Sequence, residues 1–140
     1  MEYEKKDGKV VGKLKQKNVD TGAGLERITA VMQGKQTAYD TDLFENIIKK
    51  IKSLSRIENM KAQRIVADHI RTSVFMIADG VVPSNTSRGY VLRRLIRRAV
   101  RYSDVLKMFG DLTEIVKVIH DTYKDIYPEI ANENYLRIVL

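Results

Sequence analysis

The amino-acid sequence predicts a mainly α-helical domain preceded by an N-terminal β-hairpin. Two alternating polar and apolar runs flank the dipeptide Asp7-Gly8, a typical signal of a tight hairpin turn. From Leu25 onward, apolar residues recur every three or four positions, which is the spacing of an amphipathic helix. Clusters of Gly, Pro, Ser and Asn divide this part of the chain into several helices.

The composition limits the class of protein. The chain has 140 residues, 44% hydrophobic and 31% charged, which predicts one compact soluble domain or a small pair. It has no cysteine and two distant histidines, His69 and His120, so a disulfide, a thiolate nucleophile and a zinc site are not expected. No apolar run approaches the ~18 residues that cross a bilayer, and no apolar signal core follows Met1. We therefore expect a cytoplasmic protein without a membrane partner.

The elements follow in order from local signals. The hairpin would be marginal alone and needs a sheet to join. Residues 20–24 supply turn chemistry before a first helix that begins near Leu25 and ends at Gly34. Four further helices are predicted: one after a cap at residues 40–42, a long one over 60–79, one over 89–102, and one from 111 through 126. Pro128 permits a last helix that runs to Leu140.

The net charge of +7 is concentrated on one predicted helix. Residues 88–101 carry six Arg and no acidic residue. On a helical wheel, five of these arginines fall within an arc of roughly 140°. The opposite arc holds Val91, Leu92, Leu95, Ile96, Ala99 and Val100. Because guanidinium groups match phosphate oxygens bidentately, the pattern predicts a phosphate-binding face.

Two other interpretations of this helix are open. The arginines could form a solvated face that pairs with Asp104, Asp111 and Glu114, or the helix could lie on a membrane surface, although its apolar face lacks bulky aromatics. A phosphate-binding face provides affinity but not sequence choice. Specificity is therefore expected from the loop before it, where residues 84–87 offer short amide and hydroxyl groups.

A second candidate site is the glycine-rich turn VDTGAGLER, residues 19–27. It lacks the Gly-Lys-Ser/Thr of a P-loop and the third glycine of a dinucleotide fingerprint, since position 27 is Arg. Such a turn at a helix start brings backbone N–H groups and the positive dipole end to an anion. An ordinary turn with an N-cap explains the pattern equally well.

Together, the two segments resemble one known family. NVDTGAGLERI, residues 18–28, looks like the third signature motif of class II aminoacyl-tRNA synthetases in the form used by alanyl-tRNA synthetases. Residues 67–102, ADHIRTSVFMIADGVVPSNTSRGYVLRRLIRRAVRY, resemble the start of the tRNA-recognition domain of that family. The resemblance is almost continuous over residues 1–103, and beyond them it extends only to helical pattern and spacing.

The resemblance implies a ligase that activates alanine with ATP and attaches it to tRNA(Ala). Asp20 would then hold the alanine α-amino group, and Gly22 would let the backbone approach this substrate. Gly24 and Arg27 would contact ATP, with Arg27 in a catalytic role. Asn85 would lie near the G·U pair of the acceptor stem. The RNA backbone would be clamped by Arg88, Arg93, Arg94, Arg97, Arg98 and Arg101.

The same resemblance divides the chain into three parts. Residues 1–34 would be the end of the catalytic domain, with the hairpin left over from its antiparallel sheet; 35–58 a connecting helix and linker; and 59–140 an incomplete acceptor-stem recognition domain. The family's first two motifs are not in the sequence, so we expect a fragment or split subunit that is inactive alone. A split enzyme would have a separate chain carrying the missing half.

The complete enzyme would use ATP with Mg²⁺, whereas no bound cofactor is expected on this chain alone and no zinc site is expected in it. Two alternatives to a ligase piece are a stand-alone, non-catalytic module that binds RNA stems and a purely structural domain.

Overall fold

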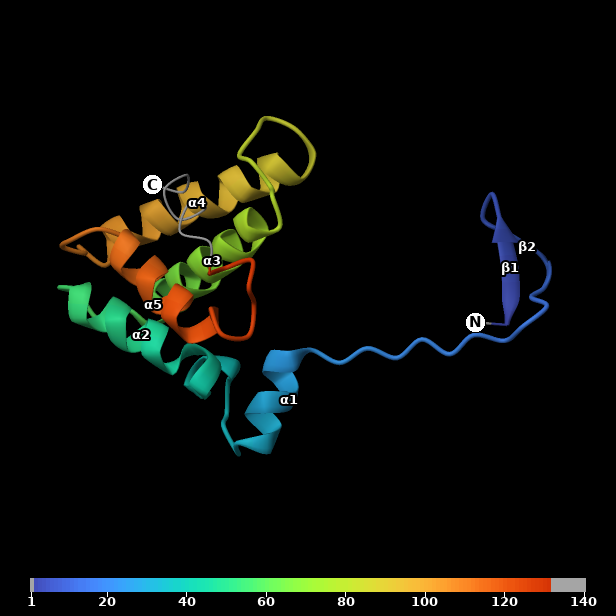
Figure 1. The fold of residues 1–140 in the computed structure, drawn as a ribbon, viewed down its shortest axis with the longest axis horizontal. Coiled ribbons are helices and arrows are strands. Elements are labelled where there is room, and N and C mark those ends of the chain that lie inside the picture. The colour runs from blue at the N-terminus through green and yellow to red at the C-terminus, as the bar shows by residue number, and fades with distance from the viewer. Residues whose placement is uncertain (1, 132–140) are drawn as a thin grey trace.

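The computed structural model describes residues 2–131, and within this range the fold is mainly helical, as predicted. Four helices form a bundle: α2 (Asp42–Leu54), α3 (Met60–Ala78), α4 (Ser87–Val105) and α5 (Thr113–Tyr123). Helix α3 packs along α4 on one side and against α2 and α5 on the other, so it is the central element of the bundle (Figure 1).

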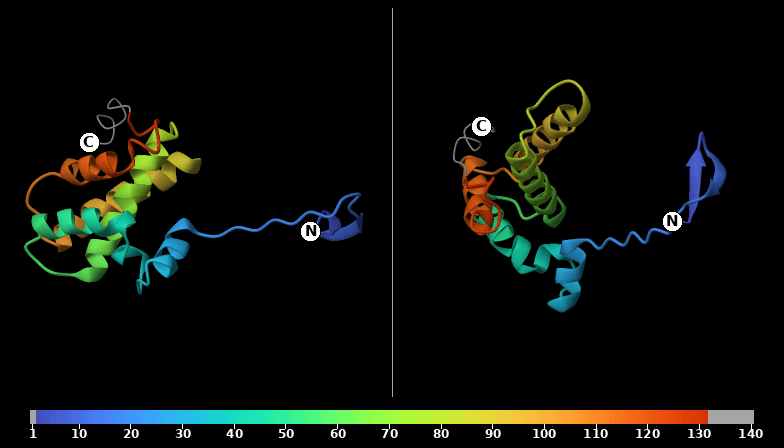
Figure 2. Two further views of the ribbon diagram at one scale, coloured as in Figure 1. Left: turned by 60° about the horizontal axis from the view of Figure 1, so that its bottom comes forward. Right: turned by 45° about the vertical axis from the view of Figure 1, so that its right-hand side comes forward.

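The N-terminal elements lie outside this bundle. Helix α1 (Leu25–Met32) contacts a short 3-10 turn, η1 (Ala38–Asp40), that leads into α2. The predicted hairpin is confirmed as β1 (Tyr3–Lys6) paired antiparallel with β2 (Lys9–Lys13). All residues of both strands are exposed. The views in Figures 1 and 2 agree that an extended segment, residues 14–24, holds the hairpin away from the helices.

The hairpin turn has the conformation that its sequence demands. Asp7 has a φ of 50° and Gly8 a φ of 80°, and two consecutive positive φ values are the signature of a type I′ turn. The pairing places Tyr3 opposite Lys13 and Lys6 opposite Lys9, with one irregularity between Glu4 and Lys5.

The core is built from the apolar stripes that the helical spacing predicts. Fully or almost fully buried side chains come from every helix of the bundle: Ile47 and Ile51 of α2, Val66 and Ile70 of α3, Leu92 and Ala99 of α4, and Ile115 and Ile119 of α5. At roughly 1.5–3 kcal/mol for each large apolar side chain that is fully buried, this core is the main source of stability of the fold.

Some predicted boundaries and faces need correction. Helix α4 begins at Ser87 rather than Gly89 and extends to Val105, and α5 ends at Tyr123 rather than 126. Residues 128–131 form turns, and the rest of the predicted last helix lies outside the described residues. Val91 and Val100, expected to pack, are 48% and 45% exposed, because they flank the apolar arc of α4 instead of facing α3.

Candidate nucleic-acid interface

Helix α4 separates its apolar and cationic faces as the wheel predicts. Leu92 and Ala99 are completely buried, whereas all five arginines of the predicted arc are exposed. The exposed arginines are Arg93, Arg94, Arg97, Arg98 and Arg101. Helix α3 packs along α4 (Figure 1), so the buried face of α4 lies against the bundle and the exposed arginines lie away from it.

The guanidinium groups of this arginine face have no acidic partners among residues 2–131. The acids proposed as partners are used elsewhere or stay apart: Glu114 accepts a hydrogen bond from Lys50 Nζ at 2.6 Å, and Asp111 accepts one from the Thr113 backbone N–H at 3.1 Å. The alternative of a neutralised face is therefore not supported. Five cations on adjacent turns repel one another, which costs roughly 0.2–0.5 kcal/mol for each (i, i+4) pair in an isolated helix.

Two tyrosines are interleaved with the arginines. Arg94 lies over the Tyr90 ring, 5.8 Å from its centre, and Arg98 over the Tyr102 ring at 5.7 Å. Tyr90 is 47% exposed on the cationic side of the helix. Arg97 has no hydrogen bond, ion pair or ring contact within the described part of the chain. The face therefore offers both exposed guanidinium groups and an exposed aromatic ring, a combination that suits nucleic acid.

The loop before α4 folds tightly over the first turn of that helix. Gly89 is buried, and a Cβ atom there would come within 2.9 Å of Ser84 Cβ and closer still to the Val82 carbonyl oxygen. Only glycine leaves room for this approach. The loop position in turn brings the exposed Asn85 to α4, where Arg93 donates a hydrogen bond to Asn85 Oδ1. The structure thus joins two of the predicted site residues.

The predicted residues of the glycine-rich turn are all exposed. Asp20, Gly22 and Gly24 lie on the extended segment or at its end, and the Asp20 side chain has no partner among the described residues. Gly24 is the N-cap residue of α1 and has an extended backbone conformation. Arg27 lies on the first turn of α1, at a hollow of about 550 Å³ that Tyr39 also lines.

Sequence reasoning missed a residue that connects this turn to the bundle. Arg71, in the middle of α3, forms an ion pair with Glu26 of α1 at 2.9 Å. A hydrogen bond from its own backbone N–H, and then the one from Arg71, lower the pKa of the Glu26 carboxyl below its ordinary value. No signal in the sequence singles out Arg71, because the side of α3 that carries it also carries the charged residues Arg64 and Asp68.

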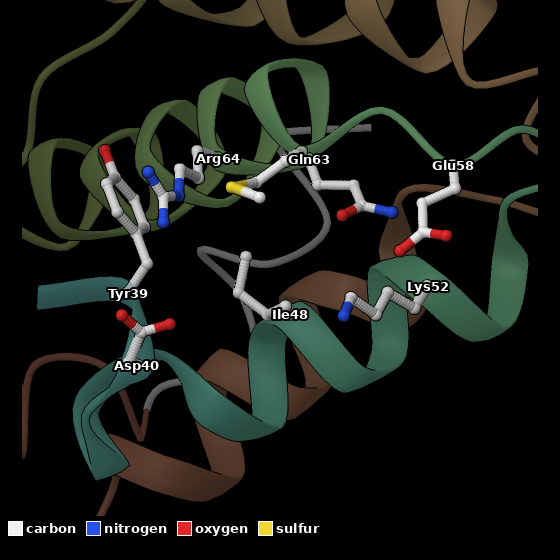
Figure 3. A pocket seen from close by; sticks show the side chains of 8 residues that line it. Tyr39, Asp40, Ile48, Lys52, Glu58, Gln63 and Arg64 are labelled. Carbon is white, nitrogen blue, oxygen red and sulfur yellow. The ribbon is translucent and has the colours of Figure 1, made fainter. Parts of the chain in front are cut away.

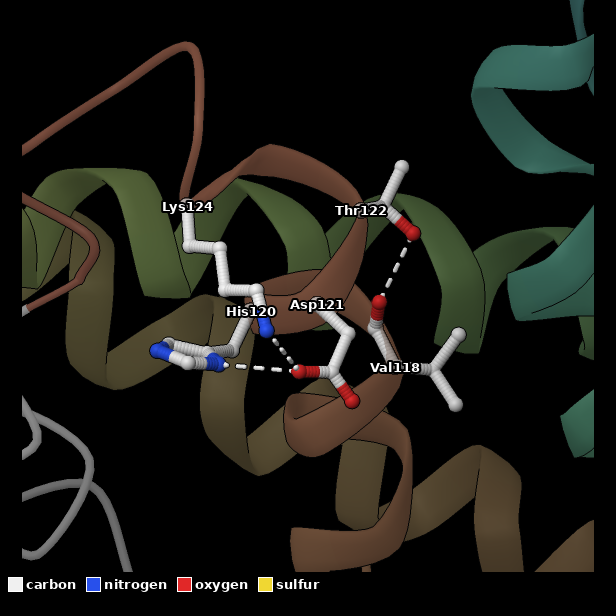
Figure 4. A network of polar contacts seen from close by, with 5 residues as sticks. All are labelled: Val118, His120, Asp121, Thr122 and Lys124. Carbon is white, nitrogen blue, oxygen red and sulfur yellow. Dashed lines mark hydrogen bonds and ion pairs between the residues drawn. The ribbon is translucent and has the colours of Figure 1, made fainter.

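The two histidines have local partners. His69 Nδ1 lies 2.9 Å from Asp68 Oδ2, and His120 Nδ1 lies 3.3 Å from Asp121 Oδ1. Figure 4 shows that the same Asp121 oxygen also accepts a hydrogen bond from Lys124, at 3.1 Å. That bond, and next the one from His120, lower the Asp121 pKa. Both histidines therefore take part in local contacts on their own helices.

Among residues 2–131, no group of three or more His, Cys, Asp or Glu side chains is arranged to hold a metal ion. No helix within this range is both long and apolar enough to cross a membrane.

The chain is similar to known proteins over almost its whole length. Residues 1–137 match the family described as tRNA synthetases class II (A). The chain belongs to this family. It is 45% identical over 146 residues to an alanine–tRNA ligase of Elusimicrobium minutum, a match that covers 99% of the chain and 17% of that relative. It is 47% identical over 136 residues to the alanine–tRNA ligase of Thermotoga maritima, covering 92% of the chain and 16% of the relative.

The chain thus spans about a sixth of the length of these relatives. Both the glycine-rich turn and the arginine face of α4 lie within the matched range of this class II chain. The resemblance found in the sequence is therefore confirmed at the level of the family.

Proposed function

We propose that this chain supplies the acceptor-stem-binding face, together with part of the alanine and ATP contacts, of an alanine–tRNA ligase. The observation that carries the proposal is the arginine face of α4, where five exposed guanidinium groups, without acidic partners among residues 2–131, lie beside the loop of Asn85. The names of the similar proteins supply the amino acid and the reaction.

The arginine face suits the backbone of an RNA stem. Its cations repeat along one side of a rigid helix, so they meet successive phosphates without rearrangement. In A-form RNA the wide, shallow minor groove is the accessible one. Asn85 stands at the N-terminal end of this face on a short loop, where its amide can reach a base edge while the arginines hold the backbone. We assign the contact with the G·U pair to Asn85.

The glycine-rich turn suits the small substrates. The Asp20 carboxylate is exposed and has no partner among residues 2–131, which suits it to bind an ammonium group such as that of alanine. A Cβ at Gly22 would meet nothing within 4 Å, so the backbone there is open to close approach. Gly24 and Arg27 at the start of α1 offer N–H groups and a fixed positive charge to the phosphates of ATP, which would arrive with Mg²⁺.

Binding of an acceptor-stem RNA hairpin with the alanine-type G·U pair tests the proposal. Five phosphate contacts predict a slope of log affinity against log salt of about −3.5 to −4.5. Arg97→Ala should weaken binding roughly 5- to 30-fold and make the slope shallower by about 0.7–0.9, because one phosphate contact is lost.

The matched control is Arg56→Ala. Arg56 is also exposed and lies over an aromatic ring, that of Phe109 at 5.8 Å, but it is on the linker between α2 and α3. Its replacement should leave both affinity and slope unchanged. A chain that fails to bind the hairpin at low salt, or equal losses in the two variants, would contradict an arginine face dedicated to RNA.

A further inference from the structure

Arg71 occupies a position that is unusual for a charged residue. Its side chain is only 14% exposed. Its guanidinium carbon lies 4.7 Å from the centre of the Phe44 ring, 5.3 Å from that of Tyr123 and 5.7 Å from that of Phe75. These rings belong to α2, α5 and α3, so Arg71 sits where three helices of the bundle meet. Its Nε atom is buried and has no hydrogen-bond partner within residues 2–131.

Among the described residues, the one acidic partner of Arg71 comes from outside the bundle. Glu26 of α1 accepts a hydrogen bond from Arg71 at 2.9 Å, and the Glu26 side chain is 37% exposed. Glu26 directly precedes Arg27 in the first turn of α1. The ion pair therefore connects the beginning of α1 with the middle of α3.

The opposite end of α1 is held in a different way. Gln33 Oε1 accepts a hydrogen bond from the Asp42 backbone N–H at 3.3 Å, and Gly34, with a φ of 63°, turns the chain toward η1. The remaining face of α1 is open to solvent, since Val31 and Met32 are both 80% exposed. Without Arg71, α1 would remain attached at its C-terminal end, and Gly34 would be able to act as a hinge.

We propose that Arg71 is a positioning residue that fixes the N-terminal end of α1 on the bundle, so that the glycine-rich turn and the arginine face of α4 keep a constant separation. Its relevance to the reaction rests on the proposed function: Arg27 would be held for ATP by the same helix, α3, that supports the RNA-binding helix. A guanidinium suits this role because it can lie flat on aromatic rings and still donate toward a carboxylate.

Distance measurements between two spin labels test this role without RNA or ATP. The 140-residue sequence contains no cysteine, so Ile28→Cys on α1 and Lys61→Cys on α3 would be the only two labelled positions. Ile28 is 49% exposed, and Lys61 is also exposed. In the otherwise unchanged chain we expect one narrow distance distribution.

Arg71→Met should widen this distribution roughly two-fold or more, because the N-terminal end of α1 is released into local opening. Arg71→Lys should restore part of the narrow peak, since it keeps the charge without the planar group. If Arg71→Met disturbs the bundle, as loss of helical circular dichroism would show, Glu26→Gln provides the same test from the exposed side and should widen the distribution as well.

Arg64→Met is the matched control. Arg64 lies two turns earlier on α3 and covers one ring, that of Tyr39 at 5.1 Å (Figure 3), but its hydrogen bond goes to Thr37 rather than to α1. The Arg64→Met variant should therefore keep the narrow distance distribution of the unchanged chain. A narrow distribution in both Arg71→Met and Glu26→Gln, or equal widening in Arg64→Met, would overturn the proposal. Failure of the unchanged chain to bind RNA would refute the proposed function and leave these distances as they are.

Discussion

The arginine face of α4 and the glycine-rich turn are both candidate sites, but they depend on their surroundings to different degrees. The arginine face lies on one helix that packs along α3. The loop before this helix is held by the hydrogen bond from Arg93 to Asn85 and by its close approach to Gly89. The turn lies on an extended segment with exposed side chains, and its nearest firm attachment is the ion pair between Glu26 and Arg71. The described residues therefore fix the geometry of the arginine face, whereas they leave most of the glycine-rich turn without supporting contacts.

This difference separates binding from chemistry. An RNA-binding face needs charges held at a regular spacing, and a single packed helix can supply them. A site that activates an amino acid needs several groups held in one productive geometry around the reacting atoms. Asp20 and Arg27 are both exposed, and no hydrogen bond or ion pair among residues 2–131 holds either side chain in place. We therefore expect the chain to bind RNA more readily than it catalyses a reaction.

The largest expected contrast between the two sites is that the chain binds RNA but does not catalyse amino-acid activation. These 140 residues alone should show no alanine-dependent exchange between ATP and pyrophosphate, because the exposed Asp20 and Arg27 side chains do not by themselves hold the reacting groups in one geometry. The measurement is incorporation of labelled pyrophosphate into ATP. Exchange above background that disappears in Arg27→Ala would show that the glycine-rich turn is already a working site.

Stability should respond very differently in the two regions. Leu92→Ala removes a completely buried side chain of α4 and should cost about 2–5 kcal/mol of unfolding free energy. Met32→Ala changes an 80% exposed side chain of α1 and should stay within about 0.5 kcal/mol. Urea unfolding measures both. A large loss in Met32→Ala would mean that the open face of α1 is covered in solution.

Gly89→Ala tests whether the loop of Asn85 is held by close packing. Alanine normally stabilises a helix relative to glycine, but at this position its Cβ would collide with the loop, so we expect a loss of about 1–3 kcal/mol. The control is Gly12→Ala in β2, where a Cβ would meet nothing within 4 Å and the unfolding free energy should not change. A Gly89→Ala variant more stable than the parent chain would contradict the tight loop.

The smallest expected effect is the pH dependence of the docking of α1 on the bundle. The Glu26 pKa is lowered in the fold, so the docking of α1 should be intact at neutral pH and weaken as the pH falls below the ordinary value of 4.5 and through the folded pKa. The distance between labels at positions 28 and 61 measures this release. Glu26→Gln should remove the transition, and an unchanged transition in that variant would assign it to another acid.

The sequence predicted the parts that depend on local signals. The hairpin turn at Asp7-Gly8, the helical stripes and the cationic arc of α4 follow from spacing within a few residues. Arg71 and Gly89 could not be placed in this way, since their roles depend on contacts with residues distant in the chain or across a loop. The exposure of Val91 was also missed, because a wheel does not show how wide a strip α3 covers.

The most direct test of the account compares two acceptor-stem hairpins that differ only in a G·U or a G·C pair. The chain should bind the G·U hairpin more tightly, by roughly 1–3 kcal/mol, and Asn85→Ala should remove this preference while it keeps the salt dependence. If Asn85→Ala leaves the preference for G·U unchanged, Asn85 does not read the pair. If the parent chain binds both hairpins equally, its arginine face and loop do not form the recognition site that we propose.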